Sequence, residues 1–337
     1  MSQASTWGVP RNASEQDASE EQFAVRADES LDALLSSHKG NSAPSYAQAG
    51  TQWIDDTGTP WIVKMYDGAD WIVTGWLNAT TNQFTPAGAA LKGQIAGLTI
   101  SNNSTDATND IDIAAGECAS EATIPLLMSY AGSTGIQLDV AYGTGSGGRF
   151  DSAISNGAWH VFIISNGTTV GRGLSKSLNP TGEPNYPAGY SHYRRIGSVI
   201  RASSALIGFT QVGDDFLLNV PVLDANAVSG PGTAAVLLAL TVPFGIKVIA
   251  NVTVSYVDTS PVGGTAVLVT SPDQTNTAPD FASRLGNVWG SAAAGDGSND
   301  LQVRTNTSQQ IRYRFSQSTA DHFLYVLTNG WTDTRGR

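Results

Sequence analysis

The chain of 337 residues has little cysteine and little charge, and both shortages limit what it can be. Its one cysteine, Cys118, excludes an intrachain disulfide and a metal site built from several cysteines. Charged residues make up 14% of the chain, against roughly 25% in an average soluble protein. Because the surface of a monomer is normally well charged, we expect part of this surface to be buried against neighbouring subunits.

Long apolar runs and a secretory leader are also missing. No run approaches the roughly 18 apolar residues of a membrane-spanning helix, and MSQASTWGVPRNASEQ has no basic region followed by an apolar core. We therefore expect folding in a cytosol without membrane insertion. The net charge of −11 makes nucleic acid a poor partner. The C-terminal stretch is locally arginine-rich, and its strand-like residues favour a solvated sheet face bearing Arg304, Arg312, Arg314, Arg335 and Arg337.

Residues 14–37 form the one segment with a convincing helical pattern. Ser14 followed by Asp17 resembles a capping arrangement, and acidic residues crowd the first turns, where the helix dipole favours them. Gly40 is expected to end the helix. The apolar stripe is thin, so the helix needs a partner surface, and we predict that it docks on a larger particle through Phe23, Leu31, Leu34 and Leu35.

The runs WIVKMY (61–66) and WIVTGW (71–76) predict a β-hairpin, because the intervening DGAD supplies an Asp-Gly turn. Strand side chains alternate, so Trp61, Val63 and Met65 should share one face. A two-stranded unit is barely stable by itself, and bulky side chains are what stabilise it.

The tryptophans around this hairpin are interpreted first as its miniature core. They are Trp53, Trp61, Trp71 and Trp76. The alternative is an exposed tryptophan pair that stacks on a sugar ring, and nothing in the sequence selects it.

The rest of the chain predicts a mainly β protein with β-sandwich-like domains. Short apolar runs recur about every 8–15 residues, a spacing typical of sandwiches or barrels. Residues 171–195 and 271–300 are expected to be long ordered loops. The predicted divisions are a helical anchoring segment at 1–43, a tryptophan-rich module at 44–88, and β domains at 89–219 and 220–337, with 89–337 as one unit the alternative.

Two motifs that could bind ions favour simpler interpretations. GTGSGG (143–148) is not followed by a helix whose amides could bind phosphate, so we expect a hairpin turn. Asp110, Asp112 and Glu117 could group around a hard cation such as calcium, but the EF-hand spacing is missing. A surface carboxylate pair is the preferred interpretation, and we predict no metal and no cofactor.

No catalytic constellation stands out. Asp55-Asp56 and Asp214-Asp215 are sequence neighbours that point to opposite faces of a strand, so neither pair suits glycoside hydrolysis, although carboxylates from distant segments stay open. The histidines show no metal-binding spacing: His38, His160, His192 and His322. We predict a partly buried imidazole for His160 and no catalytic residue.

Several stretches resemble the appendage proteins of tailed bacteriophages and prophages, commonly labelled tail fibres. The likeness is carried by PSYAQAGTQWIDDTGTPWIVKMYDGADWIVTGWLNATTNQFTP (44–86), LTISNNSTDATNDIDIAAGECAS (98–120), YRRIGSVIRASSALIGFTQVGDDFLLN (193–219) and the ending NGWTDTRGR. The long apolar repeats of a fibrous shaft and the coils of a β-helix depolymerase are missing. The resemblance therefore implies a short, globular fibre or spike.

The resemblance further implies a structural virion protein, assembled in the bacterial cytoplasm, without enzymatic activity. Such proteins are commonly homotrimers that dock by an N-terminal segment on tail, neck, portal or capsid proteins and present β domains to a host glycan or protein. The alternatives are a polysaccharide depolymerase and a collar or decoration protein that touches no host. Which part of the virion carries the chain stays open.

Overall fold

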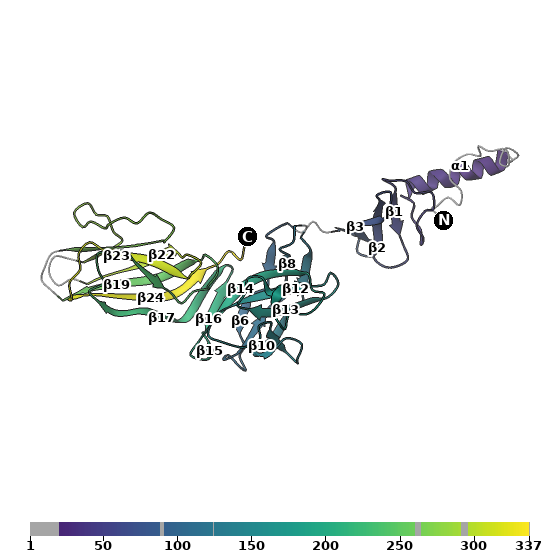
Figure 1. Cartoon of the computed structure of the whole chain (residues 1–337). Helices are drawn as coiled ribbons and strands as arrows, with labels where there is room; N and C mark the ends of the chain where they lie inside the picture. The colour runs from purple at the N-terminus through teal and green to yellow at the C-terminus, as the bar shows by residue number, and fades with distance from the viewer. Residues whose placement is uncertain (1–19, 88–90, 124, 260–263, 291–295, 337) are drawn as a thin grey trace. The chain divides into compact units, whose positions relative to one another are not determined.

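The computed structural model describes residues 20–87, 91–123, 125–259, 264–290 and 296–336. The chain divides into two compact units, Met1–Ala89 and Ala90–Arg337 (Figure 1). Strands dominate, with a short N-terminal helix ahead of several sheets, so the prediction of a mainly β protein is confirmed.

The predicted helix is α1 (Glu20–Leu35), which ends two residues earlier than expected. Ser14 and Asp17, the predicted capping pair, lie outside the described residues. Gly40 does not end the helix. Ser37 and His38 adopt left-handed backbone angles, and the His38 amide donates to the Ala33 carbonyl oxygen at 2.6 Å.

The small unit also holds a four-stranded antiparallel sheet in its described part, and its second and third strands are the predicted hairpin. Its strands, in spatial order, are β1 (Gln52–Asp55), β2 (Trp61–Tyr66), β3 (Trp71–Asn78) and β4 (Gln83–Pro86). The register between β2 and β3 shifts at one point: Val63 pairs with Gly75, and the next residue, Lys64, pairs with Val73. Thr74 of β3 therefore has no partner on β2 and is an extra residue in the pairing. Val63 is buried, whereas Met65 on the same strand is 46% exposed.

The large unit contains four sheets among its described strands. The largest has the order β15 (Ala205–Leu206), β14 (His192–Ala202), β12 (Gly157–Ser165), β13 (Val170–Ser175), β11 (Gly147–Arg149), β10 (Ser133–Ala141), β7 (Asp110–Ile113) and β6 (Ile100–Asn102). A small sheet has the order β5 (Ile95–Gly97), β8 (Gly116–Ala119) and β9 (Leu127–Tyr130).

The other two sheets form the C-terminal part of this unit. One has the order β16 (Phe209–Val212), β17 (Asp215–Ser229), β24 (His322–Thr332), β19 (Ile249–Asp258) and β22 (Gly297–Arg304). The other has the order β18 (Val236–Ala239), β23 (Gln310–Phe315), β20 (Thr265–Thr270) and β21 (Val288–Gly290).

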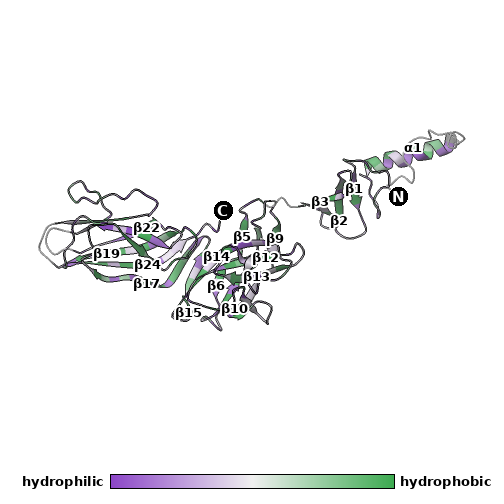
Figure 2. Cartoon of the chain, in the orientation of Figure 1, coloured by the Kyte–Doolittle hydropathy of each residue, from purple (hydrophilic) through white to green (hydrophobic). Residues whose placement is uncertain are grey.

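These two sheets pack face to face as a sandwich. Buried and half-buried residues alternate along β19 and β23, as expected for strands with one face on a core and one toward solvent. Tyr256 of β19 and Phe315 of β23 meet edge to face with their centroids 5.7 Å apart. Figure 2 shows the same mixture of apolar and polar residues along β17, β19 and β24.

Strand β12 differs because almost all of it is buried. Trp159, Val161 and Ile163 belong to the main core, whereas Phe162 and Ile164 belong to a second, smaller cluster with Phe150. Successive strand residues point to opposite faces, so both faces of β12 are covered. A near-continuous apolar run such as WHVFIIS is typical of a strand buried on both sides.

One core runs from the largest sheet into the sandwich, and Phe216 lies where they meet. The Phe216 ring stacks on the Trp331 ring of β24, with the ring centroids 5.3 Å apart. A Cβ atom added at Gly197 of β14 would lie 3.0 Å from the Phe216 ring. The domain boundary expected between residues 219 and 220 falls inside β17. The two predicted domains therefore share one continuous strand.

The glycine-rich stretch 143–148 is not the predicted hairpin turn. Strands β10 and β11 run parallel, with Gln137 opposite Gly147 and Ala141 opposite Arg149. Because the two strands run in the same direction, the short loop between Ala141 and Gly147 must reverse the direction of the chain twice. A side chain at Gly147 would lie 2.1 Å from the Ala141 carbonyl oxygen, so glycine is needed for this close approach. The predicted loop 171–195 is shorter than expected, because β13 and β14 extend into both ends of it.

Candidate interaction sites

The helix α1 exposes the predicted docking residues. Phe23 is 49% exposed, Leu31 and Leu34 are 57% exposed, and Leu35 is 85% exposed. Successive helical residues are about 100° apart, so Phe23, Leu31 and Leu34 lie within an arc of about 80°. Ala33, which is fully buried, lies outside that arc. Apolar and polar patches along α1 are visible in Figure 2.

The four tryptophans of the small unit do not share one environment. Trp53 is 6% exposed, Trp61 and Trp71 are half-buried, and Trp76 is 37% exposed. The rings of Trp53 and Trp71 meet edge to face at 5.3 Å, whereas no ring contact between described residues joins Trp61 or Trp76 to another tryptophan. The Trp53 indole donates to the Gly40 carbonyl oxygen at 3.0 Å. Trp53 is therefore the buried member of the set.

Lysines cover two of these indoles. The Lys64 ammonium lies 4.3 Å from the centre of the Trp53 ring, and the Lys39 ammonium lies 4.4 Å from that of Trp61. Each ammonium also pairs with a carboxylate, Lys64 with Asp55 at 2.8 Å and Lys39 with Asp56 at 3.0 Å. The pair Asp55-Asp56, considered as catalytic carboxylates, thus anchors lysines over tryptophan rings.

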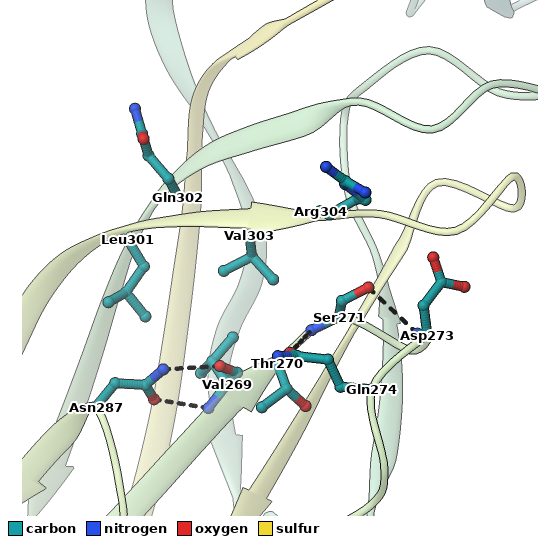
Figure 3. Close-up of a pocket in the computed structure, with 10 residues that line it drawn as sticks. All are labelled: Val269, Thr270, Ser271, Asp273, Gln274, Asn287, Leu301, Gln302, Val303 and Arg304. Carbon is teal, nitrogen blue, oxygen red and sulfur yellow. Dashed lines mark hydrogen bonds between the residues drawn. The ribbon is translucent and has the colours of Figure 1, made fainter.

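A pocket of about 480 Å³ lies between β22 and β20 in the sandwich (Figure 3). Figure 3 shows Leu301 and Val303 pointing from β22 toward Val269, whereas Gln302 and Arg304 point to the other side of the strand. The volume is in the range of small-molecule sites.

The polar groups of this pocket are largely bonded to the protein itself. The Asn287 amide donates to the Val269 carbonyl oxygen and accepts from its amide, both at 2.7 Å. Gln274 accepts from the Ser271 amide at 3.1 Å, and Asp273 pairs with Lys247 at 2.8 Å. The pocket therefore combines an apolar strip, formed by Val269, Leu301 and Val303, with polar side chains that mostly bond within the protein.

The carboxylates of TNDIDIAAGE do not form the predicted surface pair. Asp110 is 7% exposed, whereas Asp112 is half-buried and accepts from the Asn103 amide and from the Gly135 backbone amide. Burial and the nearby negative charges of Asp106, Asp139 and Asp112 raise the pKa of Asp110. The loop that carries Asp106 connects β6 to β7 directly before Asp110.

The remaining candidates for chemistry are structural. His160 is 1% exposed, not partly exposed as predicted, and its Nδ1 lies 2.8 Å from the Ser198 hydroxyl. Burial, assisted by the positive charge of Arg195, lowers the pKa of His160 to about 4. A side chain so enclosed cannot reach a substrate. Burial likewise raises the pKa of the Cys118 thiol to about 12.

The C-terminal arginines do not form one solvated face. Arg304 is exposed, Arg312 and Arg314 are half-buried on β23, and Arg335 is 5% exposed. Arg337 lies outside the described residues. Arg335 pairs at 3.0 Å with Asp214, one of the carboxylates considered for catalysis.

Arg195 pairs with Asp333, and their atoms approach to 2.5 Å. The partners are far apart in the chain, and no local pattern signals them. The ending NGWTDTRGR did mark the segment, but only through a resemblance.

No three histidine, cysteine, aspartate or glutamate side chains in the described part of the chain form a ready-made metal cluster. None of its helices is long and apolar enough to cross a membrane. Comparison with models of protein families gives no match, and comparison with curated protein sequences gives none either.

Proposed function

We propose that the chain is a structural subunit of a tailed-bacteriophage particle, a short fibre or spike that docks through its N-terminal unit and presents its large β unit to the host surface. The resemblance of residues 44–86, 98–120 and 193–219 to virion appendage proteins supports this proposal. The mainly β fold with a sandwich is compatible with it. The implied partners are further copies in a homotrimer, other virion proteins, and a host glycan or protein.

The observation that carries the proposal is the uncovered apolar arc of α1. Leu31 and Leu34 in the arc, and Leu35 beside it, each expose more than half of their surface, while the fully buried Ala33 lies outside the arc. Each apolar side chain that is buried on docking contributes about 1.5–3 kcal/mol. Three or four such residues are a substantial anchor for a helix of 16 residues.

The charge of α1 indicates what kind of surface would receive it. Its acidic residues outnumber its one basic residue, Arg26, and they are Glu20, Glu21, Asp28, Glu29 and Asp32. An apolar groove with a basic rim would complement both the apolar arc and the acidic residues. The proposed partner is accordingly a particle protein that carries such a groove.

Incorporation into particles tests this proposal. Leu34→Asp places a charge in the arc, and Val25→Asp is the matched control, because Val25 is similarly exposed at 50% but lies on the opposite side of α1. The expected result is that Leu34→Asp is lost from purified particles while Val25→Asp is retained, with both soluble proteins folding normally. Equal incorporation of the two variants would contradict docking through the arc.

Two further assays separate the proposal from its alternatives. Release of reducing ends from host polysaccharide would identify a depolymerase. Binding of the purified chain to host cells, compared with binding to cells stripped of surface glycan, distinguishes a host-attachment protein from a collar subunit.

A further inference from the structure

The strand β22 is the longest open sheet edge in the described part of the large unit. It has 8 residues, lies at the end of its five-stranded sheet and pairs with β19. The other described strands at sheet edges of this unit have two to four residues each. Proline and bulges commonly protect such an edge from pairing with another chain. β22 has no proline, and its register with β19 does not shift.

Alternate residues of β22 direct their main-chain groups away from the sheet. The Thr305 amide donates to the Val248 carbonyl oxygen at 2.9 Å, so the odd-numbered residues of β22 face β19. The amides and carbonyl oxygens of Asp300, Gln302 and Arg304 therefore point to the open edge. They have no main-chain partner among the described residues, so an added strand could bind them.

The side chains of these three residues carry charge in a fixed order. Asp300, Gln302 and Arg304 are all exposed and share the outer face of the sheet. The Arg304 guanidinium has no ion pair or hydrogen bond within the described part of the chain. The outer face of the edge is thus negative at Asp300 and positive at Arg304.

The inner face of the same edge is apolar. Leu301 and Val303 point from β22 into the pocket of about 480 Å³, on the side opposite Gln302 and Arg304 (Figure 3). Leu301 is only half-buried within the chain. A strand added to β22 could therefore cover this side chain as well as the free main-chain groups.

We propose that β22 pairs antiparallel with β22 of a second copy, with Gln302 of one copy opposite Gln302 of the other. In this register Arg304 of each copy faces Asp300 of the other on the outer face. Opposite charges that face each other across two strands stabilise the pairing. The charge order along β22 is therefore complementary to itself only when the two strands run in opposite directions.

The inner face selects the same register. With Gln302 opposite its own copy, Leu301 of each strand faces Val303 of the other, which gives two apolar pairs. A shift of one strand by two residues would place Arg304 opposite Ser298 or Gln302 instead, and both ion pairs would be lost. One register thus satisfies both faces and the main-chain hydrogen bonds.

This contact has two-fold symmetry and closes on itself. It is separate from the proposed homotrimer and does not depend on it. If the chain is otherwise a monomer, the contact makes a dimer, and if the chain is a trimer, the contact joins two trimers.

The molar mass of the full chain by sedimentation tests the contact, at concentrations up to about 0.1 mM because so small an interface is weak. Gln302→Pro removes an outward amide at an edge position that tolerates proline. The variant should therefore have half the molar mass of the wild type, whether the remaining unit is a monomer or a trimer. Gln302→Ala is the matched control, because it keeps the amide and should keep the wild-type mass. Equal masses for wild type and Gln302→Pro overturn the proposal.

Charge reversal tests the register and does not rely on proline. Arg304→Asp places like charges opposite each other at two positions and should weaken association by about tenfold or more. Asp300→Arg should do the same. The double variant Asp300→Arg/Arg304→Asp restores two opposite-charge pairs in reversed order, so it should associate nearly as strongly as the wild type. A double variant that associates no better than the single variants would rule out this register.

Discussion

Arg195 holds both carboxylate oxygens of Asp333. Its Nη1 lies 2.5 Å from Oδ2 and its Nη2 lies 2.9 Å from Oδ1, so the ion pair is bidentate. Asp333 is 3% exposed, and its Oδ1 also accepts from the Arg335 amide at 2.8 Å. The pair fastens the segment that follows β24 to β14 of the largest sheet. It therefore acts as a clamp between the sandwich and the rest of the large unit.

Asp333→Asn should destabilise the large unit by about 3–5 kcal/mol, because removing one partner of a buried ion pair leaves the other charge uncompensated. Urea unfolding monitored by tryptophan fluorescence measures the change. Asp273→Asn is the control, since its pair with Lys247 is 44–48% exposed, and exposed pairs contribute only about 0–1 kcal/mol. Similar losses in the two variants would show that the Arg195–Asp333 pair is no stronger than a surface pair.

His160 should make the protein less stable in mild acid. Its folded pKa of about 4 lies below the ordinary value of 6.5, so between these values the unfolded chain binds a proton that the folded chain does not. Stability is therefore complete above pH 6.5 and falls as the pH drops toward the folded pKa. From pH 7 to pH 5 the loss should be about 2 kcal/mol.

Urea unfolding of wild type and His160→Gln at both pH values checks this dependence. The variant should be less stable at pH 7, because the Ser198 contact changes, but its stability should fall less between pH 7 and pH 5. Parallel losses in the two proteins would assign the pH dependence to other groups.

Trp53→Ala should unfold the small unit locally, whereas Trp76→Ala should not. Truncating a buried tryptophan costs about 3–5 kcal/mol, and Trp53 also loses its bond to Gly40 and its contact with Trp71. Trp76 is 37% exposed and has less packing to lose. Hydrogen exchange of the β1–β3 amides in the full chain separates these outcomes. Equal protection of these amides in both variants would show that Trp53 is not part of the core of the small unit.

Local patterns were enough to predict the hairpin, the helix and many of the strands, although β21 and the first half of β22 lie in the predicted loop 271–300. Asp67-Gly68 sets the turn, WHVFIIS has the composition of a buried strand, and the helical spacing marks α1. What local patterns could not predict are features that depend on distant pairing. Parallel β10 and β11 are one example, because the glycine-rich loop between them also fits a hairpin turn.

The same distinction applies to the candidate sites. Helical spacing predicts that Phe23, Leu31, Leu34 and Leu35 form one thin apolar stripe on α1, and docking through that stripe stays a prediction. The burial of Asp110 was missed, because alternation along β7 says which face a side chain takes and not whether a loop covers that face. Arg195 and Asp333 are brought together only when β14 and β24 assemble. No property of either segment alone reports that contact.

Cys118 should be unreactive in the native protein. Its side chain is fully buried on β8, and burial raises the pKa of its thiol to about 12, so almost none of it is the reactive thiolate at pH 8. Ellman's reagent should therefore label no thiol per native chain within minutes and one per chain in guanidinium chloride. Labelling of the native chain at the rate of a free thiol would mean that β8 opens readily. Slow labelling instead reports the opening free energy of the small sheet, because each reaction then requires an opening event.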